Sequence, residues 1–118
     1  MKALIAAGTA FALVAGTSPS MAASDVGVTG NDLLKLCTDS ARPGAMCVGY
    51  VVGVYETYTW VNPGRLCPGP YVTNEQITDV AVKFLTDRPE MRDKNAPLLV
   101  SVSIALAFPC PPPARTPR

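Results

Sequence analysis

Apolar residues recur at helical spacing in four stretches of the chain, and the clearest is residues 73–88. Its inward positions follow the 3.6-residue period of an α-helix and comprise Ile77, Val80, Ala81, Phe84 and Leu85. Thr73 and Gln76 match the capping box that opens a helix, and Pro89 follows at its end. The pattern therefore predicts a helix from Thr73 to Arg88.

Two further helices are predicted near the ends of the domain. Residues 31–39 begin with Asn31 as a candidate cap and continue with leucines on one side. Residues 95–109 begin with Asn95 as a candidate cap and place Pro97 in the first turn, where proline is favoured. Apolar residues at helical spacing then continue this second pattern up to the Pro-Cys sequence that follows it.

Residues 45–60 are apolar on nearly every side. Cys47, Val51, Val54 and Tyr58 recur at helical spacing. Ala45, Gly49 and Gly53 form a second stripe of small residues four apart, which predicts close packing against another helix inside the domain. Glycine weakens a helix and the segment is rich in Val, Tyr and Thr, so a strand remains the alternative.

Short connections between these patterns predict an all-α fold, a small disulfide-linked antiparallel bundle of about four helices. Residues 61–72 hold three prolines and two glycines and form a long loop, while residues 90–94 make a short charged connection. Residues 111–118 include four prolines and no apolar anchor, which predicts a disordered tail. A ligand for a proline-binding domain is the alternative for this tail.

The first 22 residues have the pattern of a signal peptide. Lys2 gives a positive start, residues 3–16 are small and apolar, and Ser20-Met21-Ala22 offers a cleavage site. The apolar run is shorter than the roughly 20 residues of a membrane-spanning helix. We therefore expect export to the periplasm, a helical domain over residues 23–110, and no membrane attachment after cleavage.

Four cysteines in a small exported chain predict two disulfides. In an alternating bundle, Cys37 and Cys47 lie at one end, while Cys67 and Cys110 lie at the other, and this geometry favours those two pairs. The rival connectivity joins Cys37 to Cys110 and Cys47 to Cys67. A zinc site is the other interpretation, but the chain has no CxxC pair and no histidine.

Charge and residue types argue against several functions. Ten Lys and Arg stand against nine Asp and Glu, so the chain lacks the basic excess of a nucleic-acid binder. Histidine is absent and the thiols are expected to be oxidised, which removes the usual base and nucleophile. Glu75, Asp79 and Asp87 share the polar side of a helix, ordinarily a solvated face. We expect no enzyme, no cofactor and no metal.

Five motifs in order carry a family resemblance. They are Asp-Leu-Leu-Lys-Leu-Cys, Cys-Val-Gly-Tyr-Val-Val-Gly-Val, the Cys-Pro loop, Thr-Asn-Glu-Gln-Ile-Thr-Asp-Val-Ala-Val-Lys-Phe-Leu and Ala-Phe-Pro-Cys. Together they span residues 30–110, which resemble the Rap/Tai family of type VI secretion amidase immunity proteins. The resemblance implies a small, helical, disulfide-linked periplasmic protein, often a homodimer, that binds a peptidoglycan-cleaving effector amidase and blocks its active site. The abrupt start at residues 95–98 and the proline tail depart from the family pattern.

The long loop is the first candidate for partner binding. Trp60, Arg65 and Tyr71 are residue types that often anchor interfaces, and Cys67 and the prolines stiffen the backbone between them. The alternative is that Trp60 and Tyr71 pack over the end of the bundle. The charged connection at residues 88–94 is a second candidate, with a solvated turn as its alternative.

Two other functional classes stay open at this point. A periplasmic acid-stress chaperone would also be a small, exported helical protein with a disulfide. An envelope-associated binding module of unknown ligand is the third class.

Overall fold

The structure is a computed structural model that describes residues 27–39 and 44–117. The expected leader at residues 1–22 lies outside these residues, as do residues 40–43. Among the helices within the described ranges, none has the length and apolar character needed to cross a membrane.

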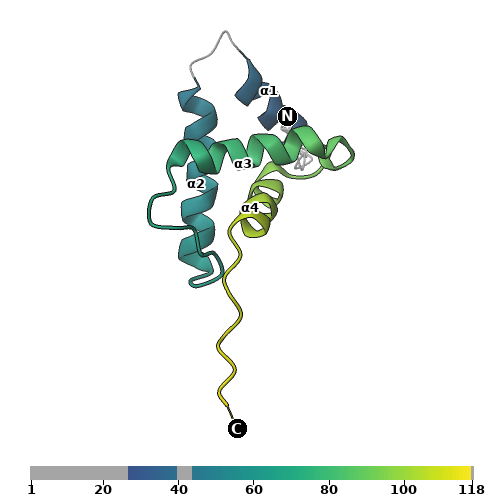
Figure 1. The fold of residues 1–118 in the computed structure, drawn as a ribbon. Helices are drawn as coiled ribbons and strands as arrows, with labels where there is room; N and C mark the ends of the chain where they lie inside the picture. The colour runs from purple at the N-terminus through teal and green to yellow at the C-terminus, as the bar shows by residue number, and fades with distance from the viewer. Residues whose placement is uncertain (1–26, 40–43, 118) are drawn as a thin grey trace, which may run out of the picture.

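Helices dominate the described part of the chain. The elements are α1 (Gly30–Thr38), α2 (Ala45–Val61), α3 (Asn74–Asp87), the 3-10 helix η1 (Pro89–Met91) and α4 (Ala96–Ala107). The predicted all-α fold of four helices is confirmed, and the strand alternative for residues 45–60 is wrong because α2 is helical throughout. Figure 1 shows α3 running across α2 and α4, while the tail after α4 extends away from the body.

All four helices contribute to one core. Its largest fully buried side chains are Leu33, Val51, Leu85, Leu99, Val100 and Ile104. Shortening one such leucine to alanine typically costs about 2–5 kcal/mol of stability. Because the contributions come from every helix, the domain folds around a single apolar centre.

Capping boxes open two of the helices. At α3 the box between Thr73 and Gln76 is confirmed, with the amide nitrogen of Thr73 donating to Gln76 Oε1 at 2.8 Å. At α1 the cap is Thr29 rather than the expected Asn31, since Thr29 and Asp32 form the box. Asn95 precedes α4 in extended conformation but makes no side-chain cap bond.

The start of α1 is bonded to the connection between α3 and α4. The amide nitrogen of Gly30 donates to the carbonyl oxygen of Lys94 at 3.0 Å, and that of Asn31 donates to Arg92 at 2.9 Å. The Arg92 side chain in turn donates from Nε to the Leu85 carbonyl oxygen at 2.6 Å, at the end of α3. The charged connection, for which the sequence left a binding surface and a solvated turn as alternatives, therefore contains η1 and joins three helices.

Two disulfides are present, with the pairing that bundle geometry favoured. Cys37 and Cys47 join the end of α1 to the start of α2, with their Cα atoms 4.9 Å apart. Cys67 and Cys110 join the α2–α3 loop, residues 62–73, to the segment after α4, with Cα atoms 4.8 Å apart. The first bridge thus links the ends of α1 and α2, and the second holds the α2–α3 loop against the segment after α4.

Candidate partner-binding surface

Trp60, just before the α2–α3 loop, and Tyr71, within it, both point into solvent. Trp60 is 87% exposed and Tyr71 is 91% exposed. The alternative in which they pack over the bundle end is therefore wrong. Trp60 also lies in the last turn of α2 rather than in the loop, because α2 continues to Val61. Its position is consequently set by a regular helix.

The middle of the α2–α3 loop is held against the end of α4. The amide nitrogen of Cys67 donates to the carbonyl oxygen of Phe108 at 3.0 Å, next to the bridge between Cys67 and Cys110. Leu66 and Val72 pack against the core from within the loop. The loop backbone is therefore held against the end of α4 and the core, while Tyr71 on its outer side remains exposed.

Arg65 lies in the exposed part of this loop. It follows Gly64, whose φ of 77° lies in the left-handed region that favours glycine. Among the described residues, the Arg65 guanidinium has no hydrogen-bond or ion-pair partner, so its five donors face solvent. The structure thus leaves Trp60, Arg65 and Tyr71 all exposed along one connection, although no direct contact joins them.

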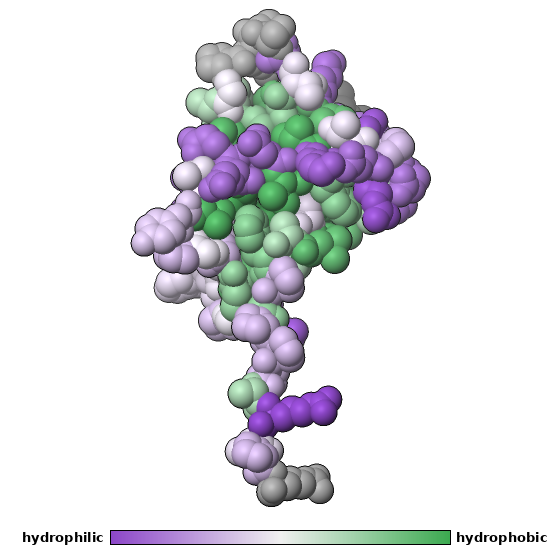
Figure 2. All heavy atoms as spheres, in the orientation of Figure 1, coloured by the Kyte–Doolittle hydropathy of each residue, from purple (hydrophilic) through white to green (hydrophobic). Residues whose placement is uncertain are grey.

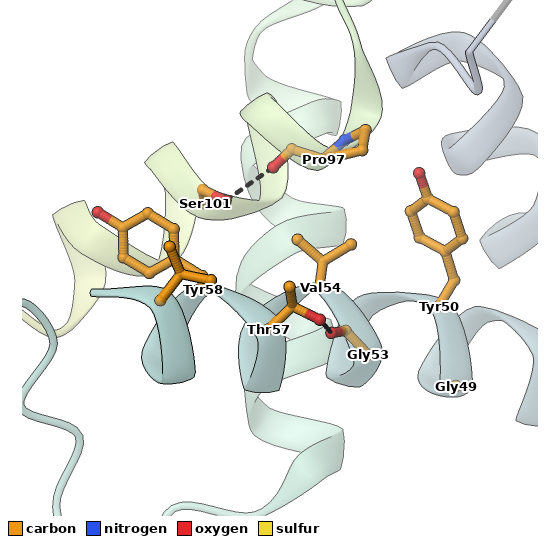
Figure 3. A pocket seen from close by; sticks show the side chains of 9 residues that line it. Gly49, Tyr50, Gly53, Val54, Thr57, Tyr58, Pro97 and Ser101 are labelled. Atoms are coloured by element: carbon orange, nitrogen blue, oxygen red, sulfur yellow. Dashed lines mark hydrogen bonds between the residues drawn. The ribbon is translucent and has the colours of Figure 1, made fainter. Parts of the chain in front are cut away.

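An apolar groove between α2 and α4 is a feature that the sequence reasoning missed. Its volume is about 620 Å³. Figure 3 shows Tyr50 and Tyr58 toward its two ends with Val54 between them, facing Pro97 and Ser101 of α4. Two of its hydroxyl groups are bonded to backbone: Thr57 donates to the Gly53 carbonyl oxygen and Ser101 to the Pro97 carbonyl oxygen, both at 2.8 Å. The open surface is therefore largely apolar.

The glycine stripe of α2 borders this groove instead of meeting a neighbouring helix. Among the described residues, nothing lies within 4 Å of a Cβ placed at Gly49 or Gly53. The prediction of close helix packing at these positions is wrong. The physical reason is that α2 buries its opposite side, through Cys47 and Val51, and leaves the stripe to solvent.

Several large apolar side chains of α2 and α4 are also exposed. Val61 of α2 lines the groove, Leu106 of α4 lines a separate hollow between α3 and α4, and Met46 and Leu98 lie outside both. On the face of the molecule that α3 crosses, which is not the face with the groove, Figure 2 shows hydrophilic residues along α3 and an apolar area below that band. Helices that are apolar on all sides are normally covered on all sides, so an open face of this kind is suited to contact with another protein.

Acid–base groups are not gathered on this surface. Glu75 and Asp79 lie exposed on α3, and Asp87 forms an ion pair with Lys83 at 2.7 Å in which both side chains are more than half exposed. Burial raises the pKa of Tyr50, which lines the groove, above its ordinary value. Among the described residues, no three side chains of the metal-binding types lie close enough together to hold a metal ion.

Comparison with known protein families accounts for this architecture. The family model of the Rap1a immunity proteins matches residues 29–110, from the cap of α1 to the second cysteine of the Cys67–Cys110 bridge. Comparisons with curated proteins and with solved structures gave no significant match. The match spans more than half of the sequence and contains all four helices and both disulfides. The chain therefore belongs to the Rap1a immunity proteins.

Proposed function

We propose that this protein is a periplasmic immunity protein that binds a peptidoglycan-cleaving amidase of a type VI secretion system and blocks its active site. Membership in the Rap1a immunity proteins supports a role in neutralising a secreted effector. The observation that carries the binding part is the exposure of Trp60 and Tyr71 on either side of an anchored loop.

The amidase contacts the α2–α3 loop together with the last turn of α2. Tryptophan, tyrosine and arginine provide most of the binding energy in many interfaces, and this surface presents one of each. The bridge and the prolines fix the backbone before binding, so that less conformational entropy is lost when the complex forms. A preorganised projection of this kind is suited to enter a cleft.

Binding, rather than catalysis, is the proposed activity. The chain has no histidine, and its four cysteines are joined in two disulfides. Inhibition by occupying an active site needs shape and contact area but no acid, base or nucleophile. The protein accordingly acts in proportion to the amount of effector that it binds, without turnover.

The periplasm is the proposed location. The first 22 residues have the n-, h- and c-regions of a signal peptide, and two disulfides suit an oxidising compartment. An amidase that cleaves peptidoglycan acts in the same compartment. Immunity protein and effector would therefore meet without crossing a further membrane.

A second copy of the chain is the proposed occupant of the α2–α4 groove. Glu56 is the one charged residue in α2, and α4 has none. Two copies can therefore bring these faces together with little burial of unpaired charge. The exposed stripe at Gly49 and Gly53 allows close approach of the backbones, and the loop surface remains free for the effector.

Co-purification tests the function. The mature protein is expressed with a candidate type VI amidase, the complex is isolated, and cleavage of purified peptidoglycan is measured with increasing amounts of the protein. We expect a stable complex and complete inhibition near one protomer per amidase. An amidase that remains fully active when the protein is in excess would contradict its assignment as the target, and the same result with every amidase of the organism would contradict the proposed function.

A further inference from the structure

The two disulfides lie in different surroundings. Cys47 is only 4% exposed and is part of the buried interior, and Cys37 packs against the core. Cys67, in contrast, is exposed, and neither it nor Cys110 belongs to the core or packs against it. A reductant in solution therefore reaches the Cys67–Cys110 bridge at the exposed Cys67, whereas in the other bridge Cys47 is buried and Cys37 is half-buried, so attack there is slower.

Few other interactions hold the segment that the exposed bridge fixes. Near Cys67, one hydrogen bond from its amide to Phe108 and the packing of Leu66 tie the loop to the rest of the domain. The bridge also spans 43 residues of sequence, so its opening releases a long stretch of chain from that constraint. The loop and the end of α4 are the parts that depend on it.

We propose that the Cys67–Cys110 bridge is a redox-sensitive clasp that a dithiol reductant opens while the Cys37–Cys47 bridge stays closed. Opening loosens the α2–α3 loop and leaves the four-helix core folded. If the loop binds the effector, as proposed above, reduction lowers the affinity for that partner. The clasp then links the neutralising activity to the redox state of the compartment.

The exchange proceeds in two balanced steps. A thiolate of the dithiol attacks the exposed sulfur of Cys67, forming a mixed disulfide, and Cys110 leaves as a thiolate that takes up a proton. The second thiol of the reductant, as a thiolate, then attacks the reductant sulfur of the mixed disulfide. This step forms a cyclic disulfide within the reductant and releases Cys67 as a thiolate that takes up a proton. The protein gains two electrons and two protons, and the dithiol loses them.

The surroundings of Cys110 accommodate the reduced form. Its Sγ lies 3.3 Å from the carbonyl oxygen of Gly64. Once protonated, this sulfur can donate a weak hydrogen bond to that oxygen, so the thiol has a partner without any rearrangement of α4. Reduction therefore need not disrupt the adjacent helix.

Timed reduction tests the order of opening. The oxidised mature protein is treated with dithiothreitol under native conditions, quenched with iodoacetamide at intervals and mapped by mass spectrometry, while circular dichroism records helix content. We expect label on Cys67 and Cys110 to appear at least about tenfold faster than on Cys37 and Cys47, with helix content retained. Equal rates, faster opening of the other bridge, or loss of helix together with the first label would overturn the proposal.

A pair of double variants tests what the clasp controls. Cys67→Ser with Cys110→Ser removes the clasp, and Cys37→Ser with Cys47→Ser is the matched control. We expect the first to remain helical and to bind the cognate amidase at least about tenfold more weakly than wild type, with a smaller effect in any control variant that folds. Failure of the first variant to fold, or wild-type affinity in it, would contradict the clasp. If the oxidised wild type binds no amidase, the proposed function fails, while the labelling order still decides whether the clasp exists.

Discussion

Gly30 lies so close to Leu99 that a Cβ atom at position 30 would be 2.6 Å from Leu99 Cδ1. The same atom would be 3.0 Å from the Cα of Arg92, which is backbone and cannot rotate away. We expect Gly30→Ala to lower the free energy of unfolding by about 1–3 kcal/mol, the usual cost of overpacking. Chemical denaturation of the purified protein measures this change.

Gly49→Ala is the matched control because that position faces open space within a helix. There alanine should increase stability by up to about 1 kcal/mol through its higher helix propensity. Opposite signs for the two substitutions are the expected result. A neutral Gly30→Ala would show that the start of α1 does not pack as described.

Acid should weaken the start of α1. Hydrogen bonds from the side chain and backbone of Thr29 hold the pKa of Asp32 below its ordinary value of 3.8. Because the pKa is lower in the folded state than in the unfolded state, the stabilisation is fully present above the ordinary value and is lost as pH falls through the folded value. Denaturation midpoints measured from neutral to acidic pH should show this loss.

Asp32→Asn identifies the contribution of this one carboxylate. At neutral pH the variant should be less stable than wild type, and the difference should shrink as the pH falls below the ordinary pKa of the carboxyl group. A difference that stays constant with pH would mean that the charge of Asp32 is irrelevant to the cap. Thr29→Val should reduce the same pH-dependent difference by removing the hydroxyl group that bonds the carboxylate.

A bulky side chain at Gly53 should separate the proposed dimer. A Cβ atom at this position meets no other part of the described chain within 4 Å, so leucine there projects from the exposed side of α2. We expect Gly53→Leu to raise the dimer dissociation constant by at least about tenfold and to leave the helix content unchanged. Light scattering over a dilution series measures the mass, and Asp79→Leu on α3 is the control.

A monomeric wild-type protein at all concentrations would refute the dimer. Unchanged dimerisation of Gly53→Leu would instead place the contact away from the α2–α4 groove. Effector binding is tested by other residues, since Trp60, Arg65 and Tyr71 do not line this groove.

Local signals in the sequence predicted much of the fold. For α3, the capping box of Thr73 and Gln76 predicted the first turn, and the 3.6-residue spacing of apolar residues predicted the helix that follows. The two signals start at the same place in the sequence, so the predicted position of α3 is close to the observed one. At α1, Thr29 and Asn31 are both residue types that cap helices well, and the sequence pattern placed the cap at Asn31. The structure selects Thr29 because Asp32 is placed to complete its capping box.

The outward side of α2 could not be derived from periodicity. Since α2 is apolar all around, the spacing of its residues identifies a helix but not the side that the rest of the chain covers. That choice depends on α4, far away in sequence, which contacts α2 beside Val54 and leaves Gly53 open. The exposure of Trp60 was undetermined for the same reason, because it depends on tertiary packing.

Binding of the effector by Trp60 and Arg65 is the central claim, and calorimetric titration of the cognate amidase into wild type, Trp60→Ala, Arg65→Ala and a Glu75→Ala control tests it most directly. Trp60 is 87% exposed, so its loss should leave the melting temperature nearly unchanged. The account predicts that Trp60→Ala and Arg65→Ala each lose about 2 kcal/mol of binding free energy, roughly thirty-fold in Kd, while the control does not. Wild-type affinity in both variants would contradict it.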